Sequence, residues 1–197
     1  MNTTDFTDKL IGKYTNIDRI DFPLIKLKDL FTREDLSFMF GENFDTDNYL
    51  NSIENSRWYT HLIFRLNSTN KIVGYLELIK VRDDVELHGG GINNSFIEKI
   101  ARTEAWYLIV KYCFDTFKVN SIKTSCWVEN EKAYNLITGT GFKEIGKNEK
   151  GNCFKFNLSH EDFLSNRIFN MLKQLNNIQN GYSIISNKKK GTTQHKK

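Results

Sequence analysis

The sequence of 197 residues contains no long hydrophobic run, because none of its apolar stretches approaches the ~18 residues that a membrane-spanning helix needs. Its first residues, Met1–Asp8, are polar and do not resemble a secretory signal. We therefore expect a soluble, cytoplasmic protein. The apolar share of 39%, with 13% aromatic residues, is enough for one hydrophobic core, and the length indicates one domain with appendages.

Cysteine is scarce. The three cysteines, Cys113, Cys126 and Cys153, are odd in number, widely separated and set in apolar segments. This pattern favours reduced, buried thiols over a disulfide framework or a metal site, so we expect no metal. No histidine stands beside Cys126 in the sequence, and buried cysteines are commonly inert, which disfavours Cys126 as a nucleophile.

An excess of positive charge is absent from most of the chain. Of the 28 Lys and Arg residues, five lie in the final segment, so residues 1–187 carry 23 basic against 24 acidic side chains. The five are Lys188, Lys189, Lys190, Lys196 and Lys197. This balance argues against a broad cationic face for nucleic acid, except through the tail, which we expect to be disordered.

The most informative stretch runs from Ser121 to Phe142. Residues 121–127 alternate like a half-buried strand, and a helical segment with an apolar face follows Asn130. Gly141 stands where a helix commonly ends in the left-handed conformation, and the next strand begins directly after it. A strand, an asparagine at a helix start and a closing Gly-Phe pair together indicate a site-building unit.

This spacing resembles the C-terminal motif of the GNAT acyltransferases, in particular the branch that acetylates the N-termini of ribosomal proteins; the matching residues are Asn130, Ala133, Leu136, Gly141 and Phe142. Three earlier blocks continue the likeness, which covers residues 22–158: Leu24–Leu36, Ile72–Leu78 and Thr103–Phe114. It implies an α/β (α+β) GNAT fold, with a mixed, mostly antiparallel twisted sheet of six or seven strands flanked by helices, plus a C-terminal helix. It also implies that Asn130 binds the cofactor. The alternative for Asn130 is a simple N-cap.

Local patterns divide the chain into four parts: an irregular or short-helical lead-in (1–21), the acyltransferase domain (22–158), a C-terminal helix (159–180) and a basic disordered tail (181–197). The C-terminal helix starts at a capping box formed by Ser159 and Asp162. Its apolar side either covers the sheet of its own chain, which we favour, or pairs with another chain.

Besides the strand at 121–127, we expect within the domain a first strand at Phe22–Leu30, helices at Arg33–Phe40 and 46–55, and five other strands: Trp58–Leu66, Lys71–Val81, Val85–Ile92, Phe142–Gly146 and Asn152–Leu158. The resemblance implies that the two helices roof the acceptor side, where Tyr49 is among the residues that would face substrate. Packing in the core or at the surface explains Tyr49 without that role, and the sequence favours this plainer interpretation.

Three consecutive glycines, Gly89–Gly91, end the third strand of the meander. Glycines inside a strand weaken it and mark a bulge or the close approach of a backbone or ligand. The resemblance implies that this is the splayed strand of the fold, whose main chain at Gly91, Ile92 and Asn93 pairs with the pantetheine arm of coenzyme A like an added strand. A flexible strand end is the alternative.

The loop expected to bind the cofactor's pyrophosphate matches the family only in part. The family places Arg or Gln, two residues, Gly, one residue, then Gly or Ala before a helix. Counting back from Thr103-Glu104-Ala105 puts Ile97, Ile100 and Arg102 at these positions, and none matches. A shift by one residue gives Glu98, Ala101 and Thr103, where only the two small residues are acceptable. The loop is therefore degenerate.

An apolar face predicts a helix from about Ala101 to Phe117, whose free N–H groups and dipole still favour an anion. Lys99 and Arg102 would add charge-assisted donors. The resemblance thus implies acetyl-CoA (coenzyme A) as the cofactor, with this binding set: Gly91, Ile92, Asn93, Lys99, Ala101, Arg102, Thr103 and Asn130.

Amine acetylation needs a group that accepts the amine's proton directly or through one water. Glu86 and His88 share a face of the strand that ends at the glycines, and Glu77 lies on the neighbouring strand; we rank them in that order as bases. In many GNAT enzymes a Tyr on the last helix protonates the thiolate. Ile137 holds that position here, and Tyr134 is the nearby replacement. An ordinary solvated or hydrogen-bonded side chain is the alternative for each.

The resemblance implies an acetyl-CoA-dependent N-acetyltransferase in which a primary amine attacks the thioester directly. The amine is a protein N-terminus, an amino acid derivative or a small amine. Two alternatives stay open: a catalytically inactive GNAT-fold binding or regulatory protein, and an enzyme that acylates a nucleic acid or an aminoacyl-tRNA, to which only the basic tail points. Monomer and homodimer are both possible, and no membrane partner is expected.

Overall fold

The computed structural model describes residues 6, 8–32, 36, 45–91, 95–177 and 183–186. The strands are β1 (Asp8–Ile11), β2 (Thr15–Arg19), β3 (Tyr59–Leu66), β4 (Ile72–Val81), β5 (Asp84–Gly91), β6 (Ser121–Trp127), β7 (Lys143–Lys147), β8 (Cys153–Ser159) and β9 (Ser183–Ser186). The helices are η1 (Leu24–Lys26), α1 (Leu27–Leu30), α3 (Thr46–Ile53), α4 (Phe96–Tyr112), η2 (Cys113–Phe117), α5 (Glu131–Gly139), α6 (His160–Ser165) and α7 (Arg167–Asn177).

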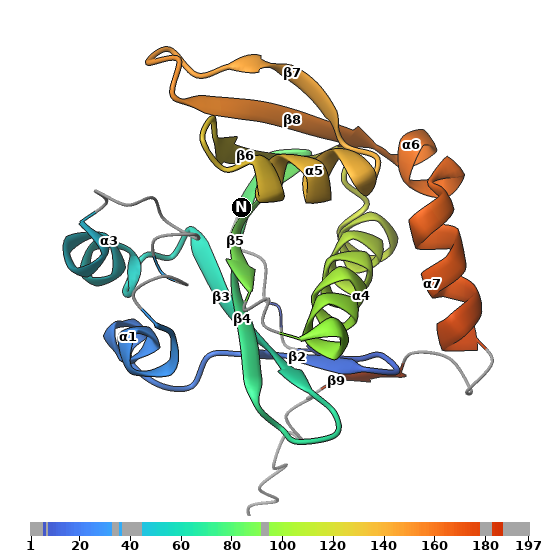
Figure 1. Ribbon diagram of the computed structural model, residues 1–197, viewed down its shortest axis with the longest axis horizontal. Helices are drawn as coiled ribbons and strands as arrows, with labels where there is room; N and C mark the ends of the chain where they lie inside the picture. Colours follow the sequence, from blue (N-terminus) through green and yellow to red (C-terminus); the bar gives the residue numbers. More distant parts are fainter. Residues whose placement is uncertain are drawn as a thin grey trace, which may run out of the picture.

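Over the described residues, nine strands form one sheet in the order β7-β8-β6-β5-β4-β3-β2-β1-β9, and all neighbours except β5 and β6 are antiparallel. Figure 1 shows α1 and α3 on one side of strands β3 to β5 and α4 on the other. The expected mixed, mostly antiparallel sheet flanked by helices is confirmed. None of the helices in the described ranges has the length and apolar character that a membrane crossing requires.

The hairpin of β3 and β4 separates two hydrophobic cores. Leu62 and Leu76 belong to the larger core with α4, whereas Ile63 and Tyr75 belong to the smaller core with α1 and α3. This division follows from the alternation of side chains along a strand. The expected hairpin and the third strand of the meander, β5, are confirmed.

The N-terminal part of the domain differs from expectation. The strand expected at Phe22–Leu30 is wrong, because η1 and α1 occupy this range. The buried side chains are Leu24, Leu27 and Phe31, whose spacing of three and four is helical, so the short alternation of Lys and Leu was misleading. The helix expected at Arg33–Phe40 falls outside the described residues except for Leu36.

The expected irregular or short-helical lead-in is also wrong for residues 8–19, which form β1 and β2. Leu10 of β1 and Ile17 of β2 are directly paired and buried. These two core residues attach a mostly polar segment to the sheet. With β9 paired to β1, the sheet has nine strands over the described ranges rather than the six or seven expected. The second expected helix is present as α3, which Asp45 caps by accepting the Asn48 N–H.

Helix α4 begins at Phe96 rather than at about Ala101, which corrects the expected boundary. Ser95 and Glu98 form a reciprocal capping box, in which the Ser95 hydroxyl accepts the Glu98 N–H and the Glu98 carboxylate accepts the Ser95 N–H. Residues 97–103, which the sequence suggested as the pyrophosphate loop, therefore lie within the first turns of a helix.

Glu104 on α4 joins three parts of the fold. Its fully buried carboxylate accepts hydrogen bonds from the backbone N–H groups of Lys13, Tyr14 and Thr15 at 2.7–2.9 Å. It also accepts one from Asn176 Nδ2 on α7 at 3.0 Å. One side chain thus holds the turn between β1 and β2 and the C-terminal helix against α4.

The C-terminal segment packs on its own chain, as the sequence favours. Phe163 of α6 and Phe169 of α7 lie against Tyr107 of α4, with ring centroids 6.2 Å and 5.8 Å away. Ser159 caps α6 by accepting the Asp162 N–H. The segment is two helices that meet at Asn166 rather than one long helix.

The unit from β6 to β8 follows local rules closely. Asn130 Oδ1 accepts the Ala133 N–H at 2.9 Å and starts α5. Gly141 has φ of 90°, and the Phe142 N–H donates to Ile137 O at 3.3 Å, which ends the helix as expected. The final pair of strands, β7 and β8, is also confirmed.

Candidate active site

The site lies where β5 and β6 diverge. The two strands pair in parallel only over Asp84 to Glu86 and Ser121 to Lys123. Beyond this point the described residues of β5 pair only with β4, and those of β6 only with β8. The Thr124 hydroxyl donates to Leu87 O at 2.7 Å and bridges the two strands where they separate. A fork in the sheet results.

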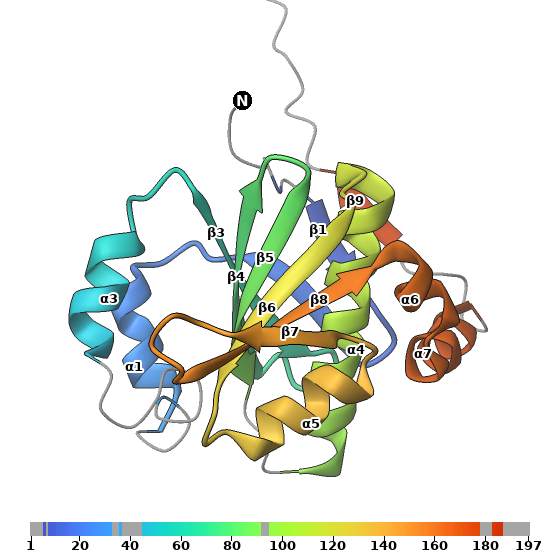
Figure 2. The same ribbon diagram turned by 90° about the horizontal axis from the view of Figure 1, so that it is seen from above.

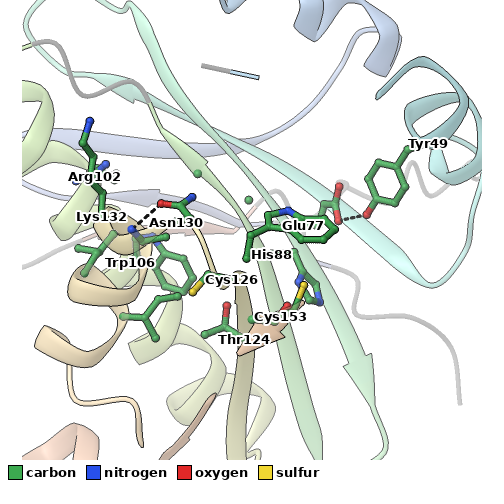
Figure 3. A pocket seen from close by; sticks show the side chains of 17 residues that line it. Tyr49, Glu77, His88, Arg102, Trp106, Thr124, Cys126, Asn130, Lys132 and Cys153 are labelled. Atoms are coloured by element: carbon green, nitrogen blue, oxygen red, sulfur yellow. Dashed lines mark hydrogen bonds between the residues drawn. The ribbon is translucent and has the colours of Figure 1, made fainter. Parts of the chain in front are cut away.

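A cavity of about 250 Å³ lies at this fork (Figure 3). Its walls come from α3, β4, β5, α4, β6, α5 and the start of β8, so distant parts of the chain build it together. The lining residues are Tyr49, Glu77, His88, Gly89, Gly90, Arg102, Trp106, Thr124, Ser125, Cys126, Trp127, Asn130, Lys132, Ala133, Leu136, Ile137 and Cys153. In Figure 2, α5 crosses over one end of α4.

One end of the cavity is acidic. Glu77 Oε2 accepts a hydrogen bond from the Tyr49 hydroxyl at 2.6 Å, and Oε1 accepts one from the Tyr75 hydroxyl at 2.8 Å. The Glu77 side chain is almost fully buried. Burial raises the pKa of Glu77 above that of an ordinary glutamate, although the two hydrogen bonds and the charge of His88 act in the opposite direction. The carboxyl group is therefore fixed in place and has an increased proton affinity.

The opposite end of the cavity is basic. Arg102 is 8% exposed, and its Nε has no hydrogen-bond partner in the described part of the chain. Burial lowers the pKa of this guanidinium, but arginine stays charged in proteins. Lys132 and Asn130 line the same end (Figure 3). A buried cation with an unused donor is a suitable place for an anionic group.

The middle of the cavity is mostly apolar. Trp106 packs edge-on against Phe142, with ring centroids 6.1 Å apart, and Ile137 also lies in this wall. Burial raises the pKa of the Cys126 thiol to about 11, so this group is neutral near pH 7. A neutral thiol is a poor nucleophile, which agrees with the expectation that Cys126 does not serve as one.

The two residues ranked first and second as bases lie next to each other. His88 Nε2 is 3.5 Å from Glu86 Oε2, and this interaction lowers the pKa of Glu86. His88 lines the cavity, whereas Glu86 is not among its lining residues. Glu77, ranked third, is the buried carboxyl group at the wall. The structure therefore brings His88 and Glu77 to the cavity, whereas Glu86 contacts His88 without lining the cavity.

Tyr134, the expected acid, has its hydroxyl engaged outside the cavity lining. Its hydroxyl donates to Glu144 Oε2 at 3.0 Å, and its ring packs edge-on against Phe154 and Phe156 of β8. It is absent from the cavity lining, whereas Ile137, one turn further along α5, is present. A catalytic role for Tyr134 stays a prediction without geometric support.

The residues expected to bind the cofactor are only partly brought together. Arg102 and Asn130 line the cavity, with Asn130 acting also as the N-cap that was its alternative role. Lys99 is exposed, Ala101 is fully buried in the core, and the Thr103 hydroxyl donates to Lys99 O, so none of the three lines the cavity. Of the splayed strand, Gly91 ends β5, whereas Ile92 and Asn93 lie outside the described residues.

The close approach of the neighbouring strand β4 requires a glycine at position 89. Gly89 has a φ of +122°, and a Cβ added there would lie 2.3 Å from Tyr75 O of β4. A side chain is excluded by backbone contact as well as by conformation. The close approach that the glycine run indicated is therefore that of β4, and it brings Gly89 and Gly90 into the cavity wall.

Sequence reasoning underrated Glu77 and its partner Tyr49. The available signal was the charged residue at position 77 between the apolar residues Leu76 and Leu78 of β4. A carboxylate flanked by apolar residues on a buried strand needs donors, and such donors mark a built site. Lys132 and Trp106 gave no comparable signal, because each is ordinary on a helix.

No protein-family model matches this sequence, and a search of the curated proteins finds no match. Solved structures do resemble the chain. They include a GNAT-family acetyltransferase from Bacillus anthracis (20% identity, TM-score 0.60, 78% of this chain and 99% of that one). A GCN5-related N-acetyltransferase from Brucella melitensis is similar over 85% of each chain (16% identity, TM-score 0.65). Spermidine N-acetyltransferase from Vibrio cholerae, solved with CoA and spermine, matches 78% of this chain and 100% of its own (16% identity, TM-score 0.59).

These similarities, together with the fork between β5 and β6, define the architecture. The chain has the fold of the GNAT acetyltransferases. The fold expected from the motif at residues 130–142 is therefore confirmed.

Proposed function

We propose that the protein is an acetyl-CoA-dependent N-acetyltransferase that transfers an acetyl group to a primary amine. The observation that carries this proposal is the divergence of β5 and β6 beyond Glu86 and Lys123, which opens a cavity with one cationic and one anionic end. A donor that carries phosphates and an acceptor that carries an amine need these two charges. The GNAT fold supports the same class of reaction.

The donor side is the edge of β5 that faces β6. Beyond Leu87 this edge has no partner strand within the described residues. Its main-chain groups are suited to pair with the amides of a pantetheine arm, as an added strand would. Arg102, whose Nε is unpartnered within the described ranges, and Lys132 offer positive charge to phosphate groups. Acetyl-CoA supplies the acetyl thioester when it is bound.

The acceptor side is the acidic end. Near pH 7 a primary amine reaches the protein mainly as an ammonium ion, because its pKa is about 8 for an α-amino group and about 10 for an alkyl amine. The carboxylate of Glu77 attracts this ion and accepts one proton from it, while Tyr49 and Tyr75 hold the carboxylate in place. The other proton that the nitrogen loses balances the departing thiolate, which leaves as a thiol. We therefore place Glu77 before His88 and Glu86 as the base.

The acceptor is a protein N-terminus, an amino acid derivative or a small amine. The acidic end supports any of these, because each presents a cationic nitrogen to Glu77. The spermine in the similar Vibrio cholerae structure makes polyamines a useful first group to test. Membership of the ribosomal-protein branch remains a proposal based on the motif at residues 130–142.

A noncatalytic GNAT-fold binding or regulatory protein is the second candidate. It is favoured by the start of α4 at Phe96, because Ile97 and Ile100 then stand in a helix where the family has the small residues of its pyrophosphate loop. The third candidate, acylation of a nucleic acid or aminoacyl-tRNA, depends on the basic tail, and residues 187–197 lie outside the described ranges.

Release of free thiol from acetyl-CoA, measured with peptides, amino acid derivatives, spermidine and spermine, tests the proposal. We expect turnover with at least one amine and a loss of roughly 10²–10⁴-fold in Glu77→Gln, because a positioned base contributes about this much. Calorimetric titration with CoA should give the same affinity for both proteins.

The matched control is Glu149→Gln, which makes the same chemical change at an exposed turn and should leave turnover unchanged. CoA binding without turnover on any amine would favour the noncatalytic candidate. If the protein shows no CoA binding and no turnover, both the proposed activity and the proposed cofactor are refuted.

A further inference from the structure

A chain of buried hydrogen bonds leads from the cavity into the smaller core. Tyr75 is the central member: its hydroxyl lies 2.8 Å from Glu77 Oε1 and 2.9 Å from His61 Nδ1. His61 Nε2 in turn lies 3.3 Å from Ile53 O. The exposed fractions of Tyr75, Glu77 and His61 are 0%, 1% and 9%, so water does not compete for these contacts. His61 and Glu77 also face each other directly across β3 and β4.

Counting protons in this chain limits its states. The Tyr75 hydroxyl has one hydrogen, so it can donate to Glu77 or to His61 but not to both. A carbonyl oxygen only accepts, so the contact with Ile53 O requires a hydrogen on His61 Nε2. When Glu77 is ionised and His61 is neutral in this tautomer, either Glu77 or Nδ1 faces the Tyr75 oxygen without a hydrogen between them.

One added proton satisfies every contact. If Glu77 holds it, the carboxyl group donates to the Tyr75 oxygen, the Tyr75 hydroxyl turns to His61 Nδ1, and Nε2–H still donates to Ile53 O. If His61 holds it as imidazolium, both ring nitrogens donate and Tyr75 donates to the ionised Glu77. The two states differ only by a shift of hydrogens along the chain.

We propose that Glu77, Tyr75 and His61 act as a single base that takes up one proton, with Tyr75 and His61 as positioning residues that set the proton affinity of Glu77. This inference rests on the proposed function for its role in catalysis. An N–H bond of the substrate ammonium breaks, an O–H bond forms on Glu77, and the Tyr75 hydrogen moves from Glu77 toward His61 Nδ1. No oxidation or further reactant is involved.

The pKa directions of the two ends agree with this arrangement. Burial raises the pKa of Glu77 and lowers that of His61, so burial favours the state in which Glu77 carries the proton and the imidazole is neutral. The other groups facing this chain of residues come from four elements: Tyr49 at α3, Tyr59 on β3, His88 on β5, Arg19 on β2 and Glu54 after α3. Arg19 acts against charge on His61, and Glu54 acts in its favour.

Two tyrosines that stack on His61 provide a matched pair of variants. The Tyr59 and Tyr75 rings lie 5.9 Å and 6.1 Å from the imidazole, with interplanar angles of 3° and 11°. Within the described residues, His61 Nδ1 contacts the hydroxyl of Tyr75 and Nε2 contacts Ile53 O, so of these two tyrosines it is Tyr75 that bonds to the imidazole. Tyr75→Phe therefore removes the hydrogen-bonded link between His61 and Glu77. Tyr59→Phe removes a hydroxyl from the other ring stacked on His61 and keeps that link.

Nuclear magnetic resonance of the protein without substrate tests the proposal independently of turnover. The sequence has four histidines, so the ring nitrogens of His61 can be assigned with a His61→Gln variant. In the wild type and in Tyr59→Phe, we expect the His61 nitrogen shifts and the Glu77 carboxyl shift to change with one common midpoint. In Tyr75→Phe the two midpoints should separate, and Glu77→Gln should abolish this transition at His61.

The proposal would be overturned if the His61 nitrogen shifts do not change as Glu77 titrates. It would also be overturned if His61 and Glu77 still share one midpoint in Tyr75→Phe. If turnover is found, the acid limb of the kcat/KM profile should move by about one pH unit in Tyr75→Phe, as for the loss of one hydrogen bond to a charged group. Tyr59→Phe should leave that limb in place. Absence of turnover would contradict the proposed function but not the shared proton.

Discussion

Arg102 and Glu77 lie at opposite ends of one cavity, Arg102 on α4 and Glu77 on β4 (Figure 3). Each is buried, so the charge that it presents is weakly screened. The cavity therefore distinguishes an anionic from a cationic partner along its length. Under the proposed function, the cationic end is the place for the phosphates of the donor and the anionic end is the place for the amine.

Arg102→Met should weaken CoA binding by roughly 10–100-fold, because a buried hydrogen bond to a charged group contributes about 1.5–3 kcal/mol. Methionine keeps much of the side-chain volume, so packing of α4 should change little. Calorimetric titration with CoA measures the effect. Lys150→Met removes the same charge from an exposed turn and serves as the control. Equal affinities for wild type and Arg102→Met would mean that the phosphates bind elsewhere.

The parts of the site that follow local rules could be predicted from the sequence. Asn130 caps α5 through the Ala133 N–H three residues ahead, and Gly141 ends the helix with a positive φ. Both interactions depend on neighbours within one helical turn, so their spacing appears in the sequence. The capping box of Ser95 and Glu98 is equally local. It was missed because residues 97–103 were assigned to a pyrophosphate loop by resemblance to the family.

The acidic end could not be predicted in the same way. The carboxylate of Glu77 receives a hydrogen bond from Tyr49, which lies 28 residues earlier in the chain and on another element. Such a contact depends on how α3 packs over the sheet rather than on any local pattern. The same holds for β1, β2 and β9, whose strands are short and depend on pairing with one another.

Gly89→Ala should destabilise the fold by about 2–4 kcal/mol, because it combines an unfavourable φ with a clash against Tyr75 O at 2.3 Å. Gly146→Ala is a close control, since Gly146 has the same φ of +122° but nothing within 4 Å of the added Cβ. Urea unfolding of both variants separates the contact with β4 from the cost of conformation alone. A Gly89→Ala protein no less stable than Gly146→Ala would contradict the close approach.

Acidification should weaken the junction of the fork. Asp84 Oδ2 lies 2.6 Å from Lys123 Nζ, and Oδ1 accepts from the Ser121 hydroxyl, where β5 and β6 begin to pair. The hydrogen bond from Lys123 is the main cause that lowers the pKa of Asp84 below its usual 3.8. A lowered pKa stabilises the fold above pH 3.8, and the contribution is lost as the pH falls through the folded-state value.

Asp84→Asn should therefore cost up to about 1 kcal/mol at pH 7, as for a partly exposed ion pair. The difference from wild type should be smaller at pH 3, because this pH lies below the unfolded-state pKa of 3.8 and proton uptake by the unfolded wild type then reduces the advantage of the ion pair. Urea unfolding at both pH values measures it. Comparing the two proteins isolates Asp84 from Glu98 and Asp162, whose pKa values are also lowered by lysines. A constant difference at both pH values would argue against the ion pair.

Glu104→Ala should be the most destabilising of these changes, at about 3–5 kcal/mol. The substitution removes the acceptor for the backbone N–H groups of residues 13, 14 and 15 and for Asn176 Nδ2. The N–H of the fully buried Thr15 would be left without that partner. Glu104→Gln keeps one accepting oxygen and should lose less, about 1–3 kcal/mol. Urea unfolding measures both, with Glu149→Ala at an exposed turn as the control. Because Glu104 connects α4 to both the β1–β2 turn and α7, a loss below about 1 kcal/mol in Glu104→Ala would mean that these segments do not depend on it.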